Sequence, residues 1–202
     1  MLQHLKIDPT PGPFQSHKTM IIMHGRGDVK ESFIPFTKEL NIAGLEYHLL
    51  DAPTPYYFGY SWYPLPPEDP IPELKKSLQL VDNYIASLGL KDEDIFLAGF
   101  SQGATLSVDH GIMSGRKFAG IVAMSPRIFL RPDLKEKVPN CKNEFFVAHG
   151  THDEMIPFAE TDGNIRKLQE AGLSAEFHSY EMGHEIDIME ILALREWMNE
   201  RL

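Results

Sequence analysis

Short runs of apolar residues alternate along this chain with segments whose apolar residues recur at helical spacing, and this alternation limits the fold more than any other feature. The runs with the length of buried strands are residues 18–23, 46–50, 94–100, 118–124, 144–148 and 175–180. Helical spacing is found at 74–88 and 165–171, each followed by a glycine that can end a helix, and again at 188–197. Strands that alternate with helices form a mostly parallel sheet with helices on both faces, so we expect an α/β fold.

The bulk composition is that of one ordinary globular domain. A chain of 202 residues can bury a substantial core, and we assign residues 1–202 to a single domain. The 19 Lys and Arg residues against 29 Asp and Glu residues give a net charge of −10, and no basic run is present. This balance argues against nucleic acid or an anionic membrane as the main partner, and favours a small molecule.

Cysteine usage and the N-terminal sequence favour a cytoplasmic location. Cys141 is the single cysteine, which excludes an intramolecular disulfide and fits a reducing compartment. The opening residues lack a basic segment followed by an apolar stretch, so we expect no secretory signal. No run approaches the roughly 20 apolar residues that span a bilayer. We therefore expect no stable membrane anchoring, and either a monomer or a homodimer.

The segment LAGFSQG, residues 97–103, places one serine between two glycines where an apolar run meets a helical pattern. Glycine loses more backbone freedom on folding than any other residue, so two of them at this junction require a reason. In the nucleophile elbow, G-x-S-x-G, small residues let a strand and a helix approach closely while the serine hydroxyl stands exposed in a strained turn. Ser101 is thus a candidate nucleophile, although a serine that only caps a helix fits the same position.

A serine hydroxyl needs a base to take its proton, and the base needs an acid to fix its tautomer. In this architecture the three residues follow the order serine, acid, histidine. Asp153 lies in the turn past the run 144–148, and His184 follows the run 175–180, just before the last helical pattern. Both are at the ends of predicted parallel strands, where open α/β sheets place their sites.

Other residues compete for these roles. Glu154 is adjacent to Asp153 and could be the acid. His149 and His152 are rivals to His184, but they precede the acid in sequence, which is the wrong order. With Asp153 they could also form a metal site, yet a second cluster of ligands and a nearby cysteine are missing. We expect no metal and no cofactor.

Stabilisation of the oxyanion requires two backbone N–H groups, one after the nucleophile and one from the loop after an early strand. The first would be that of Gln102. The segment MIIMHGRGD, residues 20–28, points to the N–H of Arg26 as the second. The Arg26 side chain could bind an anionic part of a substrate, or it could be a solvated or ion-paired arginine.

The segment 51–72 holds 7 of the 15 prolines and 6 aromatic residues. Proline is excluded from central strands and helix interiors, so we expect a long ordered loop. Loops of this length are commonly functional, and Trp62, Tyr63 and the other aromatic residues of 56–63 are our candidates for the wall of a substrate pocket. The alternative is an aromatic surface loop that packs on the core.

The motifs HGRGD, GFSQG, HGTHDEMIP and GHE resemble those of the phospholipase/carboxylesterase family, which includes acyl-protein thioesterases and small bacterial carboxylesterases. The resemblance runs from about residue 20 to the end of the chain. It implies a single-domain α/β-hydrolase with no large lid domain and no cofactor. It also implies the nucleophile, acid, base and oxyanion donors already inferred: Ser101, Asp153, His184, Arg26 and Gln102. The acyl-protein thioesterases often carry a bulky apolar residue where this chain has Arg26.

The sequence therefore predicts a serine hydrolase, a carboxylesterase that cleaves small to medium acyl esters or thioesters through an acyl-enzyme intermediate. The alternatives are an acyl-protein thioesterase or lysophospholipase, an acyltransferase in which an alcohol replaces water, and a non-catalytic binding protein on the same fold.

Overall fold

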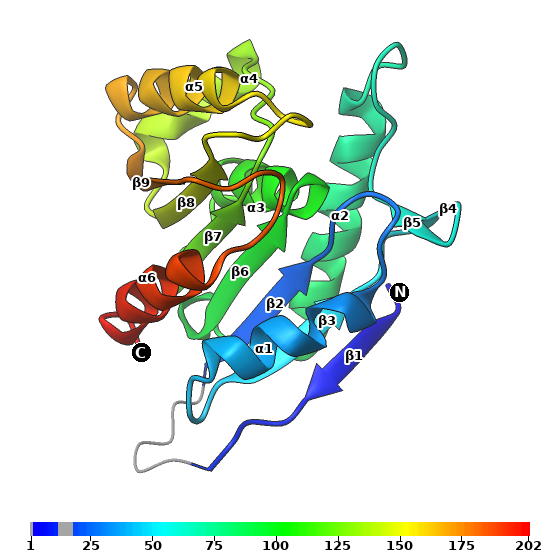
Figure 1. Cartoon of the computed structure of the whole chain (residues 1–202), viewed down its shortest axis with the longest axis vertical. Helices are drawn as coiled ribbons and strands as arrows, with labels where there is room; N and C mark the ends of the chain where they lie inside the picture. Colours follow the sequence, from blue (N-terminus) through cyan, green and yellow to red (C-terminus); the bar gives the residue numbers. More distant parts are fainter. Residues whose placement is uncertain (1, 12–17) are drawn as a thin grey trace.

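The computed structural model describes residues 2–11 and 18–202, and a seven-stranded sheet forms its centre (Figure 1). The strand order is β1-β3-β2-β6-β7-β8-β9, and every neighbouring pair except β1 and β3 is parallel. The strands are β1 (His4–Ile7), β2 (Thr19–Met23), β3 (Glu46–Leu50), β6 (Ile95–Phe100), β7 (Gly120–Met124), β8 (Glu144–Gly150) and β9 (Ser174–Tyr180). The predicted mostly parallel α/β fold is confirmed, and all six expected runs are strands.

Helices cover both faces of this sheet. On one face lie α1 (Ile34–Leu40) and α6 (Ile188–Asn199). On the other face lie α2 (Ile71–Leu88), α3 (Gln102–Met113), α4 (Pro132–Lys137) and α5 (Phe158–Glu170). Within the described ranges, no helix combines the length and apolar content needed to cross a membrane. The assignment of residues 1–202 to one domain stays a prediction.

The apolar runs are continuous because successive side chains of a buried strand supply the cores on opposite faces. Met20 and Ile22 of β2 belong to the core beneath α1 and α6, whereas Ile21 and Met23 belong to the core beneath the other helices. All five residues of β2 are buried.

The segment 51–72 differs from the expected loop, because it contains a two-stranded hairpin of β4 (Thr54–Tyr56) and β5 (Gly59–Ser61). Proline is tolerated here because the ribbon lies outside the central sheet. The hairpin rests on the loop after β2, where the Gly27 N–H donates to the Tyr60 carbonyl at 2.7 Å. A Cβ at Gly59 would lie 2.4 Å from the Asp28 carbonyl oxygen, so this contact requires glycine.

The two glycines around Ser101 are explained by two close backbone approaches. A Cβ at Gly99 would lie 2.2 Å from the Gly103 carbonyl carbon. A Cβ at Gly103 would lie 2.0 Å from the Met23 carbonyl oxygen. The beginning of α3 is therefore pressed against both β6 and β2, and only glycine leaves room for this contact.

Gly103→Ala is expected to lower the free energy of unfolding by about 2 kcal/mol or more, because the added methyl group must push α3 away from β2. Gly163 provides the matched control, because it lies in α5 with no atom within 4 Å of an added Cβ. Gly163→Ala should raise stability by about 0.5–1 kcal/mol through helix propensity. Urea unfolding followed by circular dichroism measures both, and a Gly103→Ala chain as stable as wild type would contradict the packing.

One carboxyl group is enclosed in the core beneath α6. Glu190 is fully buried, at 0% exposure. Burial raises its pKa from an ordinary 4.5 to about 8, against a weaker opposing contribution from the Asp187 backbone N–H. The folded chain therefore keeps this proton at neutral pH, while the unfolded chain releases it.

Between about pH 4.5 and 8 the folded state binds more protons at Glu190 than the unfolded state, so its contribution to stability must fall as pH rises. Glu190→Gln resembles the neutral acid and should flatten this part of the stability–pH curve. Glu196→Gln, on the exposed face of the same helix, should leave the curve as in wild type. The free energy of unfolding, measured with urea at a series of pH values, tests this prediction. If it changes with pH in the same way for wild type and Glu190→Gln, the buried carboxyl group is not neutral in the folded chain.

Candidate active site

Ser101 occupies a sharp turn between β6 and α3. Its backbone angles are φ 54° and ψ −113°, a conformation that a residue other than glycine rarely adopts. The turn is held on both sides, because the Ser101 N–H donates to the Met124 carbonyl at 2.9 Å and the Ser101 carbonyl accepts from the Thr105 N–H at 3.0 Å. This is the geometry that the G-x-S-x-G pattern predicts.

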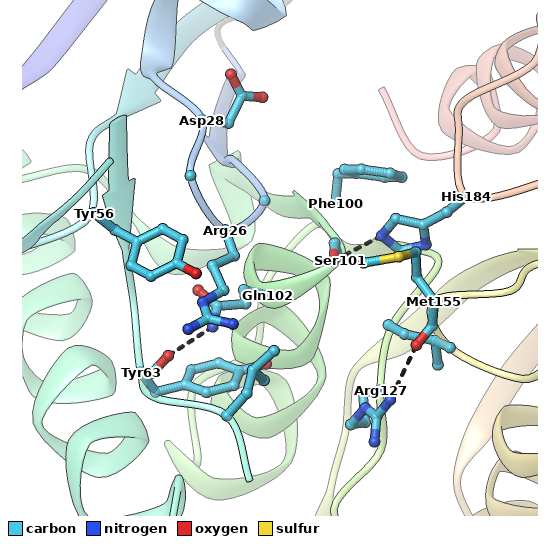
Figure 2. A pocket seen from close by; sticks show the side chains of 14 residues that line it. Arg26, Asp28, Tyr56, Tyr63, Phe100, Ser101, Gln102, Arg127, Met155 and His184 are labelled. Atoms are coloured by element: carbon cyan, nitrogen blue, oxygen red, sulfur yellow. Dashed lines mark hydrogen bonds between the residues drawn. The ribbon is translucent and has the colours of Figure 1, made fainter. Parts of the chain in front are cut away.

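The structure brings Ser101, His184 and Asp153 into one line of hydrogen bonds. Figure 2 shows the bond between Ser101 and His184. His184 Nε2 lies 2.9 Å from Ser101 Oγ, and His184 Nδ1 lies 2.7 Å from Asp153 Oδ2. Because an ionised carboxylate only accepts hydrogen bonds, Nδ1 carries the proton and Nε2 is free to accept one from the serine. The three residues come from the turns after β6, β8 and β9.

Asp153 is held as a carboxylate by its surroundings. Its Oδ1 accepts hydrogen bonds from the Met155 and Ile156 N–H groups, both at 2.8 Å. Burial by itself would raise the pKa of Asp153, but the hydrogen bonds from Ile156, His184 and Met155 outweigh it and hold the pKa below its ordinary value. The Asp153 carboxylate is therefore charged and fixed in orientation at neutral pH.

The turns that carry Asp153 and His184 are fastened to each other. The Thr151 N–H donates to the Tyr180 carbonyl at 2.8 Å, and the His152 N–H donates to the Met182 carbonyl at 3.1 Å. A Cβ at Gly150 would lie 2.3 Å from the Gly183 carbonyl oxygen. Glycine at the end of β8 thus allows the close approach of the two turns that carry Asp153 and His184.

The rival residues Glu154, His152 and His149 are outside the line of hydrogen bonds from Ser101 to Asp153. Glu154 and His152 are exposed and do not line the cavity at Ser101. His149 is fully buried, burial lowers its pKa, and its Nε2 lies 3.8 Å from Asp153 Oδ2. In the described part of the chain, no three His, Cys, Asp or Glu side chains cluster in a way that could hold a metal ion.

Two backbone N–H groups are available beside Ser101. Arg26 and Gln102 line the same cavity as Ser101 and His184. In residues 2–11 and 18–202, neither of their backbone N–H groups is engaged in a hydrogen bond. Gln102 is the first residue of α3, so the positive end of the helix dipole reinforces its N–H. This is an arrangement that can stabilise an oxyanion.

A buried histidine positions the loop that carries Arg26. His24 Nε2 accepts a hydrogen bond from the Ala52 N–H at 3.1 Å, which leaves the proton on Nδ1. That proton is donated to the Gly25 carbonyl at 2.6 Å. Burial lowers the pKa of His24, so the ring stays neutral in this role. No local pattern in the sequence reveals this contact.

The Gln102 side chain joins the aromatic segment to the helix that follows Ser101. Its Oε1 accepts from the Trp62 N–H at 3.0 Å, and its Nε2 donates to the Tyr63 carbonyl at 2.7 Å. The Trp62 ring contributes a second link, because its Nε1–H donates to the His24 carbonyl at 2.9 Å. Through these bonds the segment 61–63 supports both the loop that carries Arg26 and the beginning of α3, where the two candidate oxyanion donors lie.

The cavity at Ser101 has a volume of about 470 Å³ and a mainly apolar lining that also includes Arg26, Asp28 and Arg127. Tyr63 forms part of its wall, as expected. Trp62 does not line it: its side chain is 1% exposed and lies behind the wall, where it supports the His24 loop. The sequence alone could not show which of these two adjacent residues faces the cavity. Tyr56, one of the other aromatic candidates of 56–63, also lines it. The lining residues that the sequence did not reveal include Asp28, Leu65, Phe100, Arg127, Met155 and Ile156.

The parallel sheet, the strained serine turn and the histidine–aspartate pair after later strands define an α/β-hydrolase. The sequence profile of the Phospholipase/Carboxylesterase family matches residues 11–202. The chain therefore belongs to this family, and the resemblance noted in its motifs is confirmed.

Known proteins similar to this chain include acyl-protein thioesterase 1 of Aspergillus fumigatus, which is 39% identical over 55% of this chain. That alignment spans 49% of the relative, so this chain matches about half of the relative's length. Acyl-protein thioesterase 1 of Cryptococcus neoformans is 28% identical over 100% of this chain and 98% of its own length. Among solved structures, esterase PE8 has a TM-score of 0.88 at 22% identity, covering 100% of this chain and 99% of that one. This likeness shows the fold.

Gln102→Ala should lower the free energy of unfolding by about 1–3 kcal/mol, because it leaves the buried Trp62 N–H without an acceptor. The matched control is Gln79→Ala on the exposed surface of α2, where the lost bond to Asn83 is at the surface and stability should change by less than about 0.5 kcal/mol. Chemical denaturation measures both variants. Equal, small effects would show that the Gln102 side chain does not hold the segment 61–63.

Proposed function

We propose that this chain is a serine carboxylesterase in which Ser101 is the nucleophile, His184 the base and Asp153 the acid that orients it. The observation that carries the proposal is the unbroken line of hydrogen bonds from Ser101 Oγ through both nitrogens of His184 to Asp153 Oδ2. Family membership supports it, since the family's description names carboxylesterases.

In the first half of the reaction, Ser101 Oγ attacks the ester carbonyl carbon while its proton moves to His184 Nε2. The carbonyl oxygen becomes an oxyanion, which the N–H groups of Arg26 and Gln102 stabilise. Asp153 stabilises the imidazolium through Nδ1. When the tetrahedral intermediate collapses, the bond to the alcohol oxygen breaks, and His184 returns its proton to the leaving alcohol. The products are an alcohol and an acyl-enzyme.

In the second half, water takes the place of the alcohol. His184 Nε2 removes a proton from the water as its oxygen attacks the acyl carbon. The same two N–H groups stabilise the second oxyanion. Collapse breaks the bond to Ser101 Oγ, which recovers the proton from His184, and the carboxylic acid leaves.

The cavity supports small to medium acyl groups. Its volume of about 470 Å³ lies at the lower end of the range for small-molecule sites, and Tyr63, Leu65, Phe100 and Ile156 give it an apolar wall.

Thioester cleavage is the second candidate, favoured by the names of the fungal relatives. Oxygen and sulfur esters of one acyl group, compared by kcat/KM, separate the two. Added alcohol would reveal acyl transfer through an ester product.

We also propose a cytoplasmic protein that acts on small-molecule esters without a nucleic-acid partner. The single cysteine and the net charge of −10 support this placement. The predicted monomer or homodimer remains a prediction.

Hydrolysis of a p-nitrophenyl ester series from acetate to palmitate tests the proposal. Ser101→Ala should lower kcat/KM by at least about 10³, because it removes the nucleophile. Asp153→Asn should cost a similar factor, because the amide favours the wrong tautomer of His184.

Glu154→Gln is the matched control for the acid, since it removes an exposed neighbouring carboxylate and should keep wild-type activity. Full activity of Asp153→Asn, or equal losses in the Asp153 and Glu154 variants, would contradict the assignment. An active Ser101→Ala chain would exclude the nucleophile.

A further inference from the structure

The Arg26 side chain stands in the wall of the candidate active site. Its guanidinium carbon lies 4.1 Å from the centre of the Tyr56 ring, a cation–π contact that orients the group. Arg26, Tyr56 and Ser101 line the same cavity. Figure 2 shows Arg26 beside Tyr56 on the wall opposite Met155. The charge is therefore held at the place where a substrate must lie.

This guanidinium has no acidic partner in the described parts of the chain, where no carboxylate oxygen lies within 4 Å of its nitrogens. Asp28, two residues away, also lines this cavity, but its oxygens accept hydrogen bonds from the Val29 N–H and the Ser32 hydroxyl, both at 2.8 Å, and not from Arg26. An unpaired arginine is notable in a chain with a net charge of −10. The group is free to bind an anion.

A second guanidinium lines the cavity on the other side. Arg127 donates to the Met155 carbonyl at 3.2 Å and lies 3.8 Å from Glu160 Oε1, so its charge is partly compensated. It adds positive potential to the cavity and holds the Met155 wall. The Arg26 guanidinium, by contrast, donates no hydrogen bond to any other described residue. A guanidinium can bind a carboxylate through two parallel hydrogen bonds.

We propose that Arg26 binds a carboxylate of the substrate, so that the preferred substrates are esters that carry a second, anionic group. The carboxylate could belong to the acid part, as in a half-ester of a dicarboxylic acid, or to the alcohol part, as in an acylated hydroxy acid. This rests on the proposed function, because it requires Ser101 to cleave the ester. The Arg26 side chain thereby selects the substrate, while its backbone N–H serves the oxyanion.

Two pairs of substrates test this, each pair differing only by a methyl group in place of the carboxylate. On the acid side, monoethyl adipate is compared with ethyl hexanoate. On the alcohol side, the butanoate ester of γ-hydroxybutyrate is compared with butyl butanoate. Titration of the released acid at constant pH gives kcat/KM for each, and the ratio of anionic to neutral ester is the readout. Wild type should prefer the anionic member of at least one pair by about tenfold.

Arg26→Gln keeps the backbone N–H and should lower this ratio by about tenfold, whatever it does to the neutral rate. Arg166→Gln removes the same charge from exposed α5, where Arg166 pairs with Asp162, and should keep the wild-type ratio. Tyr56→Leu should lower the ratio because the guanidinium loses its platform, and Tyr56→Phe should restore it. Added salt should raise KM for the anionic ester more than for the neutral one.

The outcomes separate the two proposals. Hydrolysis of the neutral esters with no preference for either anionic ester would overturn the role of Arg26 and leave the esterase intact. An anionic preference that survives in Arg26→Gln would also overturn it. If wild type cleaves none of the four esters and none of the p-nitrophenyl series, both the substrate class and the proposed function fail.

Discussion

The close approach of α3 to β2 is the contact on which the geometry around Ser101 depends. Gly103 lets the backbone of α3 press against the Met23 carbonyl of β2. Gly99 likewise lets the backbone of β6 approach Gly103 closely. With the helix fixed so close to both strands, the chain has one residue in which to turn, and Ser101 takes up a positive φ of 54°. The same contact places the first N–H of α3 next to the loop after β2. Strain at the serine is thus maintained by packing in the core beneath it.

A second layer of buried polar contacts extends this arrangement outward. The Gln102 side chain binds the backbone of Trp62 and Tyr63, and the Trp62 ring binds the His24 carbonyl. His24 in turn holds Gly25 and Ala52. Each of these groups is buried, so losing one partner would leave another unsatisfied. The loop with Arg26, the hairpin beneath it and the beginning of α3 are therefore positioned together, which is what preorganised oxyanion donors require.

Sequence reasoning predicted the features that depend on strand order and missed those that depend on side-chain direction. Buried parallel strands are continuous apolar runs, so the sheet could be recognised, and the turns after β6, β8 and β9 had to meet at one edge. The strand β1 was missed because its four residues are partly exposed and lie at the edge. Trp62 and Tyr63 are adjacent aromatics in a proline-rich segment, and no pattern tells which of them faces a cavity. Arg127 belongs to no motif, and Met155 was only a neighbour of Asp153 in HGTHDEMIP, so only the folded chain shows that both lie at the cavity of Ser101.

The most direct test of the account is to locate the covalent adduct of a fluorophosphonate by peptide mass spectrometry. A serine activated by His184 should react once per chain, at Ser101, although the chain contains other serines. The reaction should slow sharply in His184→Ala, because the base that removes the proton is gone. The account predicts a single adduct on Ser101 whose formation depends on His184. Absence of an adduct, an adduct on another residue, or labelling that is equally fast without His184 would contradict it.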